Sequence, residues 1–158
     1  MIVKIMEWVR LGVISLAFFF AYWFLSDAQY DAVWVFEWLV PAIMVPMAGF
    51  SGFEGLIWGE ESAREKGYET GSNYQKQSDI ALLSYAFTAL MVFVFDWGKF
   101  AALAVLICGM FFFFFSGINH ALQAIFHKNF HWANINRPFI LFALILALIY
   151  PVMRAFVS

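Results

Sequence analysis

Hydrophobic residues fall into five blocks along this chain, and each block has about the length that crosses a lipid bilayer. The blocks cover residues 9–25, 33–58, 80–95, 98–126 and 138–156. A bilayer core of about 30 Å is crossed by about 20 helical residues. Because 64% of the 158 residues are hydrophobic and only 13% are charged, the chain has too little charge to cover a water-soluble globule. The sequence therefore predicts an all-α fold, an integral membrane bundle of five transmembrane helices.

The whole chain, residues 1–158, is predicted to form a single transmembrane domain. The hydrophobic blocks and their flanking residues predict five helices, near residues 9–25, 33–66, 73–95, 98–127 and 138–156. The last helix is expected to begin at Pro138, since proline suits the first turn of a helix.

Local signals refine the second and third helices. Pro41 and Pro46 each remove a backbone donor, which predicts a kink in the second helix. Gly67 suits the left-handed conformation at a helix C-terminus and predicts the end of that helix. Ser72 and Gln75 match a capping box, so the third helix is expected to begin near residue 73.

Basic residues are distributed unequally between the two ends of the predicted bundle. The end with the N-terminus carries seven basic residues, and the opposite end carries only Lys99 and Arg154. The seven are Lys4, Arg10, Arg64, Lys66, Lys76, Lys128 and Arg137. The positive-inside rule then predicts a cytoplasmic N-terminus in a multi-pass protein of the cell membrane. The apolar blocks predict the lipid bilayer as partner. The net charge of −2 and the lack of a basic run predict that no nucleic acid is bound.

Small residues recur at four-residue spacing on the second helix, at Ser51, Gly55 and Gly59. Such spacing lets another helix approach closely. We therefore expect a packing face here, through which the chain could also form a homo-oligomer or join a larger membrane complex.

Polar residues interrupt the apolar blocks near the cytoplasmic ends of three predicted helices. Ionisable groups within a membrane span are costly, so they indicate function. Glu54 and Glu61 share one face of the second helix. A polar stripe on the fourth helix consists of Ser116, His120, Gln123 and His127. The topology places all these groups at a similar depth. The predicted ligand-binding residues are Glu54, Glu61, Gln75, Asp79, Asn119, His120 and Gln123.

The spacing of these residues argues against a metal site. Residues seven apart on a helix, such as Glu54 and Glu61, are separated by about 10.5 Å along the axis. One ion with ligands at about 2 Å cannot take both. Cys108 is the only cysteine, and the Glu-x-x-His pattern of di-iron bundles is absent. No metal site is predicted, no catalytic residue or cofactor is identified, and enzymatic activity stays open.

Residues 61–75 resemble a family of small uncharacterised prokaryotic multi-pass membrane proteins that is loosely DoxX-like. In that family a Glu-x-Ala segment leads to Gly-Trp and then Gly-Ser-Pro-Phe-Gln. A later Gly-His, an Asn-rich turn and a Pro-containing last helix follow. Here Asn119-His120, residues 133–136 and Tyr150-Pro151 stand at the corresponding places, so the likeness covers roughly residues 50–155.

The chain departs from the family pattern at three positions. Tyr68 replaces the tryptophan, Asn73 replaces the proline, and Gln77 stands where the family tends to have glutamate. The loss of that acid weakens any metal or proton site built on it. The resemblance implies the membrane fold and singles out Glu61, Gln75 and His120, but it implies no reaction.

Three functional hypotheses follow. The leading one is a polar pocket at the cytoplasmic membrane edge that binds, and in its stronger form translocates, a small ligand or a proton. Glu61 and His120 would be its principal polar contacts, while Gln75, Asn119 and Gln123 would supply hydrogen bonds. The alternatives are an accessory or structural subunit of a larger membrane complex, and a metal- or quinone-dependent membrane redox enzyme.

Overall fold

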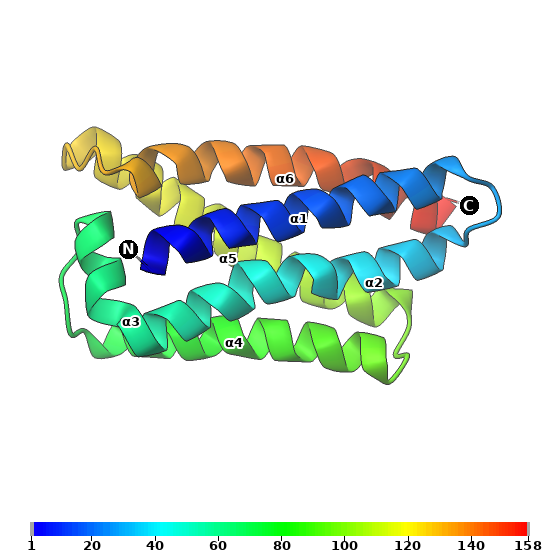
Figure 1. Ribbon diagram of the computed structural model, residues 1–158, viewed down its shortest axis with the longest axis horizontal. Coiled ribbons are helices and arrows are strands. Elements are labelled where there is room, and N and C mark those ends of the chain that lie inside the picture. Colours follow the sequence, from blue (N-terminus) through cyan, green and yellow to red (C-terminus); the bar gives the residue numbers. More distant parts are fainter. Residues whose placement is uncertain (1, 158) are drawn as a thin grey trace.

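The computed structural model describes residues 2–157, which form an all-helical bundle (Figure 1). Its elements are α1 (Ile2–Ser26), α2 (Ala32–Met44), the π-helical turn η1 (Val45–Gly49), α3 (Phe50–Lys66), α4 (Asn73–Val94), α5 (Lys99–Phe126) and α6 (Trp132–Val157). Five helices are long and apolar enough to span a membrane, with α2, η1 and α3 together supplying the second. The predicted five-helix membrane bundle is confirmed, and the architecture is that of a multi-pass membrane protein.

The helices run up and down, so the same end of the bundle holds the start of α1, the end of α3, the start of α4, the end of α5 and the start of α6 (Figure 1, left). We call this the N-terminal end of the bundle. The predicted polar residues near these helix ends are therefore brought to one end of the molecule.

The helix α2 lies at the centre of the bundle. Its side chains at Val35, Phe36, Leu39, Val40 and Ile43 are fully buried, and they cover more than one face of the helix. The outer helices instead expose large apolar side chains such as those of Phe19, Phe87 and Phe111. An apolar exterior around an apolar core is what a helical bundle in lipid requires.

The second span is not a straight helix. The π-helical turn η1 contains Pro46 and follows Pro41, which confirms the predicted kink at the prolines. A second break, which the sequence did not predict, lies at Trp58, whose φ of −119° and ψ of 32° are not helical. Figure 1 shows the last turns of α3 rising across the N-terminal end of the bundle after this break.

The connection between α3 and α4 matches its predicted limits but not its predicted cap. Gly67 ends α3 with a φ of 68°, and α4 begins at Asn73. The prediction of a capping box is wrong, because the Ser72 side chain makes no capping hydrogen bond. Gln75 Nε2 instead donates to the backbone oxygen of Gly59 at 3.1 Å, which ties the start of α4 to α3.

Two helices begin earlier than the hydrophobic blocks indicated. The first begins at Ile2 rather than near residue 9, and the last begins at Trp132 rather than at Pro138, which lies inside α6. The added turns carry polar residues that are partly or fully buried, such as Glu7 and Asn134. Hydrophobicity does not mark helical turns of this kind.

The small-residue face of α3 packs against α4. A Cβ atom at Gly55 would collide with the Asp79 carboxyl group, and one at Gly52 would collide with the Asp79 backbone oxygen. Gly59 lies against the Gln75 side chain in the same way. The predicted packing face is confirmed within the chain, and contact with a second chain through Ser51, Gly55 and Gly59 stays a prediction.

Replacing Gly55 with alanine is expected to lower the free energy of unfolding by about 2 kcal/mol, because the new methyl group overpacks the α3–α4 contact. Denaturation in mixed micelles measures this. Gly12→Ala is the matched control, since nothing lies within 4 Å of a Cβ there, and its effect should stay below about 1 kcal/mol. Equal effects of the two substitutions would contradict the close contact.

Candidate functional site

Nine polar residues from four helices and one connection gather at the N-terminal end of the bundle. We call them the polar cluster: Glu7, Arg10, Glu54, Ser62, Tyr68, His120, Asn134, Asn136 and Arg137. The side chains of Glu54, His120 and Asn134 are among the most buried polar groups, with 3%, 3% and 1% of their surface exposed. Polar groups buried in a protein usually form hydrogen bonds, and those of the polar cluster form them with each other.

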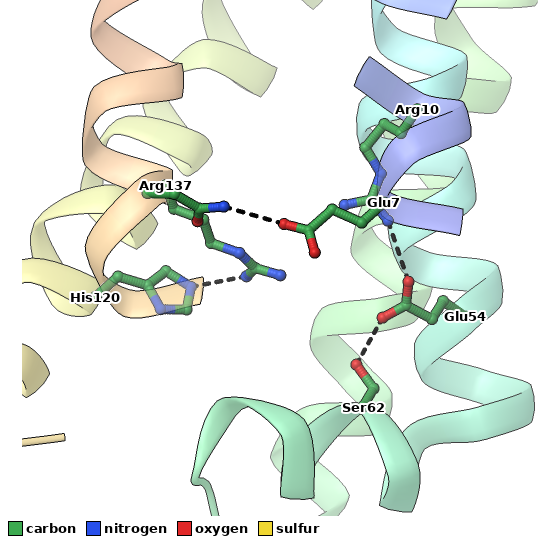
Figure 2. Close-up of polar contacts among 7 residues, drawn as sticks. Glu7, Arg10, Glu54, Ser62, His120 and Arg137 are labelled. Carbon is green, nitrogen blue, oxygen red and sulfur yellow. Dashed lines mark hydrogen bonds and ion pairs between the residues drawn. The ribbon is translucent and has the colours of Figure 1, made fainter. Parts of the chain in front are cut away.

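One half of the polar cluster joins α1 to α3. Arg10 Nη2 lies 3.2 Å from Glu54 Oε2 and forms a partly buried ion pair. The hydroxyl of Ser62, two turns further along α3, donates to Glu54 Oε1 at 2.7 Å. Both carboxylate oxygens of Glu54 therefore accept a hydrogen bond (Figure 2).

The other half centres on His120 of α5. Arg137 Nη1 lies 2.8 Å from His120 Nε2, and the Asn134 Oδ1 atom lies 2.6 Å from His120 Nδ1. Because a guanidinium group can only donate, Nε2 must accept, and in the neutral ring the proton is on Nδ1. Asn134 Nδ2 donates to the backbone oxygen of Asn129, which turns Oδ1 toward the imidazole. The contacts therefore assign a neutral His120 with the proton on Nδ1.

Tyr68 covers the outer side of His120. The two rings stack with centroids 5.7 Å apart. The Tyr68 hydroxyl donates to Asn134 Oδ1 at 3.1 Å and lies 2.8 Å from His120 Nδ1. Tyr68 comes from the connection between α3 and α4, so this contact brings a loop residue onto the buried histidine.

Charged side chains of α1 and α6 link the two halves. Asn136 Nδ2 donates to Glu7 Oε1 at 3.2 Å. Arg137 interacts electrostatically with Glu7 and Glu54, and Figure 2 shows its guanidinium group between His120 and the Glu7 carboxylate. The two acids and two bases balance in formal charge, as buried charges require.

Burial raises the pKa of the Tyr68 hydroxyl above its ordinary value, and the positive charge of Arg137 offsets part of this rise. The folded protein thus holds this proton more tightly than the unfolded chain. The resulting stability is present at neutral pH and is lost as the pH rises through the raised pKa. Phenolate absorbance during an alkaline titration should show Tyr68 ionising at a higher pH than an ordinary tyrosine.

Tyr68→Phe provides the subtraction that isolates this ionisation, because the ring is kept and only the hydroxyl is lost. The wild-type minus variant curve should contain one late-titrating group. A difference curve in which this group ionises in the ordinary range of tyrosine would contradict the buried position of the hydroxyl.

The structure places the predicted site residues in different environments. Glu54 and His120 lie in the polar cluster, and Asp79 is buried against Gly55 at the α3–α4 contact. Gln75 bonds to the α3 backbone, and Gln123 lines a shallow surface pocket. Asn119 is exposed and Glu61 is partly buried. The role of Glu61 and His120 as the principal polar contacts of a ligand stays a prediction.

Several members of the polar cluster were not predicted as site residues. Arg10 and Arg137 were counted only as charges flanking the membrane, and Glu7 was not used. Glu7 and Arg10 lie three residues apart, so they share a helix face if the helix begins before residue 7. Asn134 and Asn136 were treated as a turn. If α1 and α6 had been predicted to begin where they do, Glu7, Asn134, Asn136 and Arg137 would have been placed on helices rather than in flanking segments.

The polar cluster offers hydrogen-bonding and ionisable groups. Among residues 2–157, no three His, Cys, Asp or Glu side chains are grouped so that they could hold a metal ion. Side chains of these kinds can exchange protons and can form hydrogen bonds with polar groups. Comparisons with protein-family models, curated proteins and solved structures found no match for this chain.

Proposed function

We propose that the polar cluster binds a proton or a small polar ligand, in a multi-pass protein of a prokaryotic cell membrane. The N-terminal end of the bundle faces the cytoplasm in this proposal, since most lysine and arginine residues lie there. The observation that carries the proposal is a buried, charge-balanced group of side chains held by four helices within candidate membrane spans.

The position of the charges supports a functional role. Arg10 lies eight residues after Ile2, or about 12 Å along α1 at 1.5 Å per residue. Charged groups at such a place in a span are costly. Well-packed apolar residues can often replace a buried ion pair without loss of stability. Stability alone therefore does not account for this arrangement.

The unpaired atoms of the polar cluster support ligand binding. Arg10 Nε and Asn136 Oδ1 are buried and have no hydrogen-bond partner among residues 2–157. Buried polar atoms are usually satisfied, so this donor and this acceptor are available to a small polar ligand. Asn136 is 8% exposed, which leaves its oxygen directed into the protein.

The arrangement of Tyr68, His120 and Arg137 favours a proton over a small polar ligand. Tyr68 is partly exposed and contacts His120, and Arg137 contacts the other nitrogen of the same ring. A second proton on His120 would have to occupy Nε2, which Arg137 now covers. Arg137 would then turn toward the carboxylate of Glu7, with which it already interacts. Proton binding is thus coupled to a movement of a charged side chain.

Proton flux into proteoliposomes tests the stronger form of this proposal, in which the polar cluster passes protons across the membrane. A pH-sensitive dye inside the vesicles should report faster acidification with the wild-type protein than with empty vesicles. Glu54→Gln and Tyr68→Phe should each slow the flux at least tenfold. Glu60→Gln is the matched control, because Glu60 is on the same helix with 72% of its side chain exposed, and it should leave the flux unchanged.

Circular dichroism of each reconstituted variant separates loss of function from loss of fold. Equal acidification rates in wild-type and empty vesicles would contradict proton passage, and equal rates in all four proteins would contradict the role of the polar cluster. The accessory-subunit and redox hypotheses stay predictions, since no contact among residues 2–157 favours either.

A further inference from the structure

A shallow surface pocket of about 570 Å³ lies at the N-terminal end of the bundle, beside the polar cluster but not within it. It is formed where the ends of α3 and α5 meet the start of α6. The residues that line it are Gly67, Gln123, His127, Lys128, Asn129, Phe130 and His131. We call it the basic pocket. None of the polar-cluster residues lines it.

Three hydrogen bonds hold the turn that forms the basic pocket. The Asn129 backbone donates to Gln123 O at 3.1 Å, and the Asn129 side chain donates to Gly67 O at 3.1 Å. Asn134 Nδ2 holds the Asn129 oxygen from the other side at 3.0 Å. The turn is thus fixed to α3, α5 and α6, and a site on it would be pre-organised.

The backbone of Lys128 helps to shape the basic pocket. Its φ of 52° is left-handed, which is uncommon for a residue other than glycine. Gly67, with a φ of 68°, faces this turn, and a Cβ there would meet the Asn129 side chain and the His131 ring at 2.8 Å. The close approach of the two connections therefore depends on this glycine.

The lining of the basic pocket favours an anion. It contains one lysine, two imidazoles and two amides, which can all donate hydrogen bonds, and it contains no acidic residue. Basic pockets between membrane helices on the cytoplasmic side bind phosphate-bearing headgroups. We propose that the basic pocket binds the phosphate group of an anionic ligand, which is either a lipid headgroup or a soluble phosphate.

The surroundings place this pocket at the depth of lipid headgroups. Phe126, Phe130 and Trp132 flank it with 72%, 67% and 65% of their surface exposed. Of these three, Trp132 has the side chain that favours the membrane–water interface. The proposed site therefore lies where both a lipid headgroup and a soluble phosphate can reach it.

Histidine NMR on the full chain in phosphatidylcholine nanodiscs tests the proposal. The chain has three histidines, and His127→Gln and His131→Gln variants assign their ring signals. One arm adds inorganic phosphate at constant ionic strength against chloride, and the other replaces part of the lipid with phosphatidylglycerol. The signals of His127 and His131 should shift and saturate, while that of buried His120 stays in place.

Lys128→Asn is the diagnostic variant, because asparagine tolerates the left-handed conformation and lacks the charge. It should weaken binding about fivefold, the effect of one basic residue near an anionic surface. Lys76→Gln is the matched control, since Lys76 is exposed at the same end of the bundle and does not line the pocket.

Each outcome decides the proposal. A saturable shift with phosphate, with phosphatidylglycerol or with both supports the site and identifies the source of the phosphate group. No shift, the same shift with chloride, or equal weakening by the two lysine variants would overturn it. The proton-flux assay is independent of this titration, so failure of the basic pocket leaves the role of the polar cluster unaffected.

Discussion

Replacing Glu54 with glutamine is expected to lower the free energy of unfolding by about 3–5 kcal/mol, because it leaves the Arg10 guanidinium buried without its counter-charge. Only 14% of the Arg10 side chain and 4% of the Glu54 side chain are exposed, so water cannot replace the lost partner. The hydrogen bond from Ser62 also changes, since glutamine can present only one oxygen. Unfolding by sodium dodecyl sulfate in mixed micelles measures the loss.

A double-mutant cycle with Arg10→Met tests whether the ion pair is the cause. If Arg10 and Glu54 stabilise each other, the double variant should be more stable than the sum of the two single effects indicates, by about 1–3 kcal/mol. Glu60→Gln removes a charge from the exposed pair with Arg64 and should cost less than about 1 kcal/mol. Additive single effects would show that the two side chains do not interact.

The second large effect is expected for Asn134→Leu, which should cost about 3 kcal/mol, since it leaves more than one buried polar group unsatisfied. Asn134 is 1% exposed and uses both ends of its amide. Its oxygen contacts His120 Nδ1 and accepts from Tyr68, and its nitrogen donates to Asn129 O. Leucine has a similar volume, so cavity formation adds little to the effect.

Asn119→Leu is the matched control for this substitution. Asn119 is exposed on α5, so the same change of side chain should alter the free energy of unfolding by less than about 0.5 kcal/mol. An unchanged free energy of unfolding for Asn134→Leu would contradict the network around His120.

The spans could be predicted from sequence because hydrophobicity adds up over about 20 residues, the length that a bilayer selects. Summed hydrophobicity does not locate the ends of the helices. The first turns of α1 and α6 hold Glu7, Arg10 and Arg137, which lower the local hydrophobicity although the backbone is helical. The break at Trp58 also escaped prediction, since neither proline nor glycine occupies that position.

The site was predicted in part for a related reason. Glu54 and His120 stand out because each interrupts an apolar run, and the structure buries both. Arg10 and Arg137 lie near helix ends, where a charge can point to water or into the bundle, and the sequence does not distinguish these directions. Tyr68 reaches a histidine 52 residues away, a contact that depends on the turn of α3 after Trp58.

The spacing of Gly55 and Gly59 predicted a close helix contact, but it did not identify the partner. Asp79 fills the space over Gly55, and Gln75 lies beside Gly59. Asp79 and Gln75 were predicted as ligand-binding residues because of their expected depth in the membrane, and that role stays a prediction. The structure shows that both side chains contact α3.

The central claim is that His120 is held neutral between Arg137 on one side and Asn134 and Tyr68 on the other. Nitrogen-15 NMR of ring-labelled histidine, in the full chain reconstituted in lipid at neutral pH, tests it most directly. The predicted spectrum shows His120 with a protonated Nδ1 and an unprotonated Nε2, protected from exchange with water, whereas His127 and His131 exchange freely. A doubly protonated or Nε2-protonated His120, or one that exchanges as fast as the other two, would contradict the account.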